Sequence, residues 1–180
     1  MVGIDIGTKS IKIIELAKSG ATWQMKSSGA VGYSGVSPDK AQDDKELSAI
    51  AEVVKKIFVQ IGITSKDVNL ALPESLVFTR VIKFPLLSEE EVSAAVKWEA
   101  EQYIPVPVDQ LYLDYTVIES RETEQDILLA ASPRHIVDSY VNLFEILGLE
   151  VAIFEPSILS VVRLVKHAEQ TDIPPGVVNI

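Results

Sequence analysis

A short motif near the N-terminus, Gly3-Ile4-Asp5-Ile6-Gly7-Thr8-Lys9-Ser10, has the residue types and spacing needed to hold a phosphate group. Apolar runs on both sides predict a strand hairpin that presents this turn at the end of a sheet. Gly7 has no Cβ, so the backbone there can approach a phosphate closely. The amides of Gly7 to Ser10 can then point inward as an anion-binding nest.

The side chains of this motif add to the predicted phosphate site. Thr8 and Ser10 supply hydroxyl donors, and Lys9 supplies a positive charge. Asp5 stands at a strand end, where a carboxylate can hold Mg²⁺ through water. The alternative is an ordinary hairpin turn, in which glycine, threonine and serine are common. The motif is neither a Walker loop nor a dinucleotide fingerprint, because a strand follows it where those motifs need a helix.

A second candidate is Glu155, which separates a predicted strand, Leu149–Phe154, from a predicted helix, Ser157–Glu169. Pro156 is suited to the first turn of that helix. Glu155 would then project from the edge of a sheet where ligands of α/β layers bind, and could position a Mg²⁺-bound or attacking water. The alternative is a solvent-exposed carboxylate stabilised by the positive end of the helix.

Hydrophobic periodicity predicts the elements that must position these residues, in two blocks. In the first block Asp43 or Asp44 caps the start of a helix, and Gly62 caps its end. The order is β-β-β-α-β, which suits an α/β sheet layer. Its elements are four strands, Val2–Ile6, Ile11–Leu16, Trp23–Ala30 and Asp67–Leu72, and one helix over 47–61.

The second block predicts a compact β-α-β-β-α-β module. Ser88 and Glu91 form a capping box at the start of its first helix, which Pro105 ends. The charge run Ser120–Asp126 is interpreted as a solvated hairpin loop. Trp98 lies off the apolar stripe of the helix, so it either docks a partner or packs under the prolines. The strands are expected at 76–84, 111–119, 127–132 and 149–154, and the helices at 88–103 and 134–147.

Composition excludes several classes of function. The 180 residues carry a net charge of −10, which disfavours binding to nucleic acid or to anionic lipid. The sequence has no cysteine and two histidines, so neither a disulfide framework nor a zinc site is expected. No run is long enough to span a bilayer and no signal peptide is evident, so we expect a soluble cytoplasmic protein.

The stretch Leu72–Asp114, which contains Trp-Glu-Ala-Glu-Gln-Tyr-Ile-Pro at 98–105, resembles the PilM family of type IV pilus assembly, and more distantly the division protein FtsA. Val2–Leu16 is similar to the first phosphate motif of that family. Glu155-Pro156 is similar to the Glu-Pro step of actin-fold chaperones, in which the glutamate faces Mg²⁺ and its waters. The resemblance covers the chain from Val2 to Ile180.

This resemblance implies an actin-like α/β fold, with a ribonuclease-H-like subdomain 1A at 1–75 and 155–180 and an inserted α+β subdomain 1C at 76–154. It implies ATP and Mg²⁺ as cofactors. Asp5, Gly7, Thr8, Lys9 and Ser10 would bind the nucleotide, with Asp5 and Glu155 reaching Mg²⁺ through water. The implied partner is the cytoplasmic tail of PilN, an inner-membrane protein, docked near 1C.

The function implied is an ATP-binding cytoplasmic scaffold that a partner brings to the inner membrane. A sugar- or acetate-kinase-like phosphotransferase is the alternative, but it needs a general base and no unassigned carboxylate stands in a suitable motif. A self-associating filament former like FtsA is a third possibility. The second half of the fold, with a second phosphate motif Asp-x-Gly, is expected after Ile180. This chain alone is therefore expected to lack measurable ATPase activity, and hydrolysis that Asp5→Ala abolishes would contradict that.

Overall fold

The computed structural model describes residues 1–20 and 22–170, with side chains up to 163 in the last helix. The predicted loop Thr171–Gly176 and the apolar run Val177–Ile180 lie outside the described residues. The chain forms two compact units. One comprises Met1–Glu74 and the chain from Leu143 onward, and the other comprises Ser75–Asn142.

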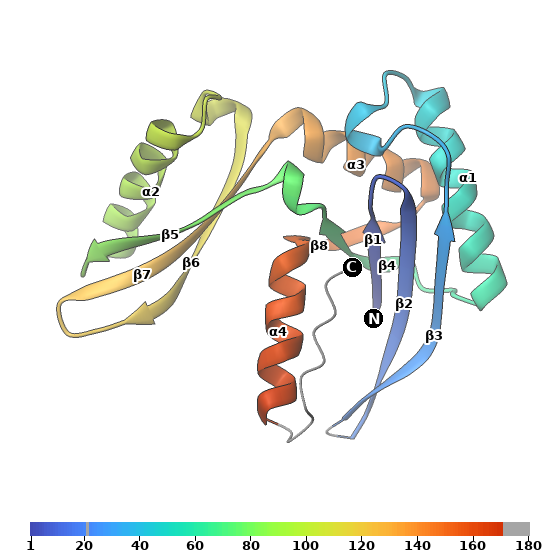
Figure 1. The fold of residues 1–180 in the computed structure, drawn as a ribbon, viewed down its shortest axis with the longest axis horizontal. Helices are drawn as coiled ribbons and strands as arrows, with labels where there is room; N and C mark the ends of the chain where they lie inside the picture. The colour runs from blue at the N-terminus through green and yellow to red at the C-terminus, as the bar shows by residue number, and fades with distance from the viewer. Residues whose placement is uncertain (21, 171–180) are drawn as a thin grey trace. The chain divides into compact units, whose positions relative to one another are not determined.

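The first unit is built on a five-stranded sheet of order β3-β2-β1-β4-β8 (Figure 1). The hairpin pairs β1–β2 and β2–β3 are antiparallel, whereas β4 runs parallel to both β1 and β8. This is the ribonuclease-H-like strand order that the resemblance implied. The strands are β1 (Val2–Ile6), β2 (Ser10–Ser19), β3 (Thr22–Gly32), β4 (Asp67–Leu72) and β8 (Glu150–Pro156).

One face of this sheet is the core of the unit. Its side chains alternate along the strands and are almost fully buried, among them Ile4, Ile11, Leu70 and Val68. Helix α1 (Asp44–Ile61) packs on this face. A Cβ built on Gly29 of β3 would lie 2.9 Å from Cγ2 of Ile57, so glycine is required for the close approach of α1 to β3.

Of the two residues predicted to cap the start of α1, Asp43 and Asp44, the structure selects Asp43, and Gly62 caps the end as predicted. The carboxylate of Asp43 accepts a hydrogen bond from the amide of Glu46 at 2.9 Å. Gly62 ends the helix in the left-handed conformation, with a φ of 74°. Both caps satisfy backbone groups that a helix end leaves unpaired.

The second unit is a three-stranded antiparallel sheet of order β5-β7-β6 with helix α2 on one face. The predicted capping box is present, since Ser88 and Glu91 bond reciprocally at the start of α2. The core is formed by Ile82, Val92, Val96, Ala100, Ile127 and Leu129. The elements are β5 (Phe78–Pro85), α2 (Glu89–Tyr103), β6 (Leu111–Ser120) and β7 (Glu124–Pro133), with short 3-10 turns at Pro38–Lys40, Glu74–Leu76 and Val108–Gln110.

The structure corrects the predicted boundary of the second block. The sequence pattern places the strand Leu149–Phe154 in that block, but β8 pairs in parallel with β4 in the first sheet. Phe154 of β8 stands opposite the buried Leu70 and is itself half-buried, whereas Ile153 is exposed. Helix α3 (Arg134–Leu147) leads from the second unit back to the first, and α4 (Ser157–Gln170) follows β8. The second unit is therefore an insertion between β4 and β8.

Candidate functional site

The predicted phosphate turn joins β1 to β2 and is tighter than the sequence suggested. The amide of Gly7 donates to the carbonyl oxygen of Ser10 at 2.9 Å, so it is used within the turn and is not one of the inward-pointing donors expected there. Thr8 and Lys9 are exposed at the tip, and Ser10 is half-buried at the start of β2. Their side chains stand where a ligand at the sheet end could reach them.

Neither backbone conformation nor packing explains why residue 7 is a glycine. Its φ lies outside the left-handed region that favours glycine. A Cβ built on Gly7 would have the carbonyl oxygen of Ser10 as its nearest neighbour, at an ordinary contact distance of 3.4 Å. The missing side chain therefore leaves room on the surface of the turn, as close approach by a ligand would require.

Tyr33, which no sequence motif marks, joins this turn to the segment after β3. Its hydroxyl donates to the carbonyl oxygen of Gly7 at 2.8 Å, and its amide donates to that of Lys9 at 3.0 Å. Burial raises the pKa of the phenol, with a smaller contribution from the negative charge of Asp39. No local motif announces this contact, because the two residues are 26 positions apart.

The two predicted carboxylates lie in one cross-strand row of the first sheet. Asp5 on β1 stands opposite Ala71 on β4, which in turn stands opposite Glu155 on β8. Residues paired in this way point to the same face, and two strand spacings separate the carboxylates by about 10 Å at the backbone. The intervening side chain is only a methyl group. The space between Asp5 and Glu155 is therefore open above Ala71.

Both carboxylates have basic partners on this face. Asp5 forms a 3.6 Å ion pair with Lys12, its direct neighbour on β2. Glu155 accepts a hydrogen bond from the hydroxyl of Ser160 at 2.5 Å and forms an ion pair with Arg163, both on α4. The side chain of Glu155 is only 15% exposed. The alternative interpretation of Glu155 as a solvent-exposed carboxylate is therefore wrong.

A cavity of about 490 Å³ opens on this face beside Glu155. Its apolar part comes from the hairpin and β8, where Ile14, Trp23 and Ile153 border it. At its polar end lie Glu155, Ser160 and Arg163, and Ala71 lies in the floor. The cavity thus has a largely apolar wall with a few polar groups at one end, and neither Asp5 nor the turn at 7–10 lines it.

These residues fit a magnesium ion that is bound mainly by its ligand and by water. Among the described side chains, those of residues 1–20 and 22–163, no group of three or more histidine, cysteine, aspartate or glutamate residues could hold a metal ion. Mg²⁺ usually keeps several waters and takes one or two carboxylates together with substrate phosphates. Asp5 and Glu155 could supply those carboxylates, with the open space above Ala71 left for the hydrated ion.

The second unit presents a different kind of surface. Trp98 on α2 is 60% exposed, so it does not pack under the Pro105–Pro107 segment as one interpretation of the sequence held. Tyr103, at the end of the same helix, carries the guanidinium of Arg80 over its ring at 3.7 Å. Exposed aromatic residues of this kind are enriched where proteins bind partners.

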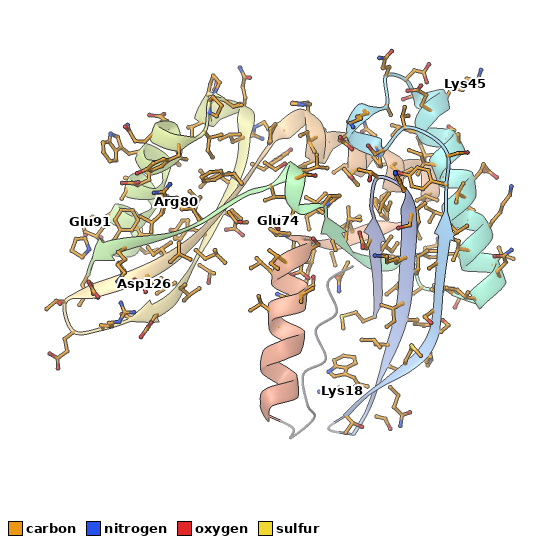
Figure 2. The ribbon with its side chains drawn as sticks, viewed as in Figure 1. Lys18, Lys45, Glu74, Arg80, Glu91 and Asp126 are labelled. Carbon is orange, nitrogen blue, oxygen red and sulfur yellow. The ribbon has the colours of Figure 1, made fainter. Side chains whose placement is uncertain are left out.

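The charged segment after β6 is an ion-pair cluster and not merely a solvated loop. Arg121 bonds Asp126 at 2.9 Å, Glu124 at 3.0 Å and Glu119 at 2.5 Å. Asp126 lies on β7 and is buried, and Figure 2 shows it on the sheet of the second unit. The bond from Arg121 lowers the pKa of Asp126, and the same bond raises the pKa of the guanidinium.

Comparison with known families identifies the chain. The family model of the type IV pilus assembly protein PilM matches residues 3–169. The chain therefore belongs to the PilM family. This agrees with the resemblance carried by the motif at 98–105 and by the phosphate turn.

The solved structures that are similar to the chain include two of known context. One is a PilM–PilN type IV pilus biogenesis complex, with a TM-score of 0.81 and 22% identity over 94% of this chain and 51% of that one. The other is the cytoplasmic domain of EpsL, an inner-membrane component of the type II secretion system of Vibrio cholerae. Its TM-score is 0.55, with 14% identity over 88% of this chain and 58% of that one. The chain thus spans little more than half of either.

These likenesses confirm the predicted fold of this PilM family member. The chain has the actin-like α/β fold, with the strand order described for the first unit. None of the helices in the described part of the chain is both long enough and apolar enough to cross a membrane.

Proposed function

We propose that the protein carrying this sequence is an ATP-binding scaffold of type IV pilus assembly. The observation that carries the nucleotide site is the row in which Asp5 and Glu155 face one side of the sheet with only Ala71 between them. The phosphate turn lies at the end of the same hairpin. Membership of the PilM family supports the role in pilus assembly.

Each residue of the proposed site has a distinct task. The open surface of Gly7 lets the phosphates approach the turn, where Thr8 and Ser10 donate hydrogen bonds and Lys9 offsets negative charge. Asp5 and Glu155 orient waters of a magnesium ion. When bound, Mg²⁺ would neutralise phosphate charge. Any hydrolysis is a slow switch, and Glu155 is the residue placed to orient the attacking water.

Calorimetric titration tests this site in the full protein that carries the sequence. ATP is expected to bind more tightly with Mg²⁺ than with EDTA, and Asp5→Asn should remove most of that difference. Lys55→Gln is the control, because Lys55 forms an exposed ion pair with Glu52 on α1, at 3.3 Å. Absence of binding, or Mg²⁺-dependent binding that Asp5→Asn leaves intact, would show that the assignment is wrong.

The proposed partner is the cytoplasmic tail of a PilN-type inner-membrane protein, which would bring a cytoplasmic protein to the membrane. The similar solved structure is itself a PilM–PilN complex, which supports this choice. We propose that the second unit, corresponding to subdomain 1C, takes part in docking. Its exposed Trp98 and Tyr103 offer large side chains for burial by a peptide.

A peptide titration tests the docking proposal. A PilN-type N-terminal peptide should bind the full protein, and Trp98→Ala should weaken binding by at least tenfold if Trp98 is an anchor, about 1.4 kcal/mol. Trp23→Ala is a matched control, since Trp23 is also exposed but lies in the first unit. Absence of peptide binding would contradict the scaffold role, and an effect confined to Trp23→Ala would move the docking surface to the first unit.

A further inference from the structure

Two side chains of α4 contact the carboxylate of Glu155, the group that would face the proposed metal ion. One carboxylate oxygen accepts the hydroxyl hydrogen of Ser160 at 2.5 Å, and the other pairs with the guanidinium of Arg163. Ser160 and Arg163 border the same cavity as Glu155. Both oxygens of the carboxylate are therefore engaged by side chains from the first two turns of one helix.

The two carboxylates of the row differ in how tightly their cations hold them. Lys12 stands 3.6 Å from Asp5 and is a single exposed ammonium group. Arg163 holds a carboxylate that is only 15% exposed, although its own side chain is 64% exposed. The Arg163 guanidinium can therefore turn into solvent with little loss of packing, whereas the Glu155 side chain is largely buried.

Ser160 and Arg163 leave further lone pairs on the Glu155 carboxylate, but the positive charge of Arg163 repels a divalent cation that approaches the same group. We propose that Arg163 is the resident counter-ion of Glu155 and that it must leave this carboxylate when a magnesium nucleotide binds. Arg163 is then a positioning residue that sets how strongly Mg²⁺ favours nucleotide binding. This inference rests on the nucleotide site proposed above.

The exchange also links the site to α4. With Arg163 in place, the second turn of α4 is fastened to the end of β8 through Glu155. With the metal in place, Ser160 alone remains on the carboxylate. Nucleotide binding thus changes the attachment of the helix that follows β8, and the change needs no movement of the sheet.

The test compares the dissociation constant of ATP with saturating Mg²⁺ and with EDTA, by calorimetry on the full protein. The ratio of the two constants measures the contribution of the metal alone. Arg163→Gln should raise this Mg²⁺ enhancement by roughly two- to fivefold, the range expected for release of a partly exposed ion pair. Arg163→Lys keeps the positive charge but lacks the planar guanidinium with its paired N–H donors. This variant should therefore raise the Mg²⁺ enhancement less than Arg163→Gln does.

A double-variant comparison isolates the competition at Glu155. In the Glu155→Gln background, Arg163→Gln should no longer change the Mg²⁺ enhancement, because no carboxylate remains to be released. Lys55→Gln removes one positive charge elsewhere in the same unit and should leave the enhancement unchanged. Circular dichroism establishes whether each variant is folded. If Arg163→Gln does not fold, Arg163→Lys takes its place in the comparison.

Each result decides between the two proposals. If the parent protein shows Mg²⁺ enhancement and neither Arg163 variant raises it, the inference about Arg163 fails while the nucleotide site stands. A lower enhancement in Arg163→Gln would make Arg163 a phosphate ligand and also overturn the inference. If neither the parent nor the variants show any enhancement, the metal site and the inference fail together.

Discussion

Asp5 and Glu155, which are 150 positions apart in the sequence, point to the same face of one sheet with Ala71 between them. The spacing of about two strands, with only the methyl group of Ala71 between them, leaves room for a hydrated ion between the two carboxylates. A substitution at Ala71 can therefore test the proposed metal site as directly as a substitution of either carboxylate. It allows the site to be tested without removing either charge.

The first prediction concerns Ala71. Ala71→Leu fills the space between the two carboxylates and should weaken ATP binding in Mg²⁺ by more than tenfold, measured by calorimetry. Ala30→Leu is the matched control, because Ala30 is exposed in the same cross-strand row on β3. Ala71 lies on the cavity side, so both variants should keep the parent circular dichroism spectrum. Unweakened binding by a folded Ala71→Leu variant would place the ligand elsewhere.

The second prediction concerns the hydrogen bond between Tyr33 and Gly7. Tyr33→Phe removes the donor to a part-buried carbonyl and should lower the free energy of unfolding by about 0.5–1.5 kcal/mol. Urea denaturation measures the change. Tyr115→Phe is the control, since its hydroxyl makes an exposed contact of 3.5 Å and should matter less. Equal effects of the two substitutions would mean that the Tyr33 bond does not fasten the turn.

The third prediction concerns the close packing of α1 on β3. Gly29→Ala places a methyl group 2.9 Å from Cγ2 of Ile57. Isoleucine is β-branched and has few χ1 rotamers in a helix, so this methyl group cannot rotate away easily. Overpacking of this kind should cost about 1–3 kcal/mol of stability. In Gly32→Ala the new methyl group would meet only the carbonyl oxygen of Lys9, at 3.7 Å, so this variant should be nearly neutral in the same thermal denaturation experiment. A neutral Gly29→Ala would contradict the packing argument.

The fourth prediction concerns acid stability of the second unit. The pKa of Asp126 is lowered by its bond from Arg121, so the folded state binds the proton less readily than the unfolded chain. The stabilisation is therefore complete above the ordinary aspartate value of about 4 and is lost as the pH falls below it. Urea denaturation between pH 7 and pH 3 should show this loss. Arg121→Gln should make stability less dependent on pH in that range, and an unchanged pH dependence would exclude Asp126 as its source.

The sequence determined the local elements of this protein well. The caps at Asp43, Gly62 and the Ser88–Glu91 box were all predicted, because each involves residues within a few positions of one another. The strands and helices were likewise found from periodicity, apart from small shifts at their ends. Strand β8 was recognised as a strand, but its apolar pattern could not say which sheet it joins.

The candidate site depended on the tertiary structure to a greater degree. Asp5 and Glu155 were found from local motifs, yet their common row, the open space above Ala71 and the hold of Arg163 on Glu155 follow from strand register and helix placement. The same holds for Tyr33, whose bond to Gly7 joins segments that no short motif connects. Sequence patterns report interactions within a turn of helix or a pair of neighbouring strands. Which distant segments become neighbours is decided by burial of their apolar faces in the folded chain.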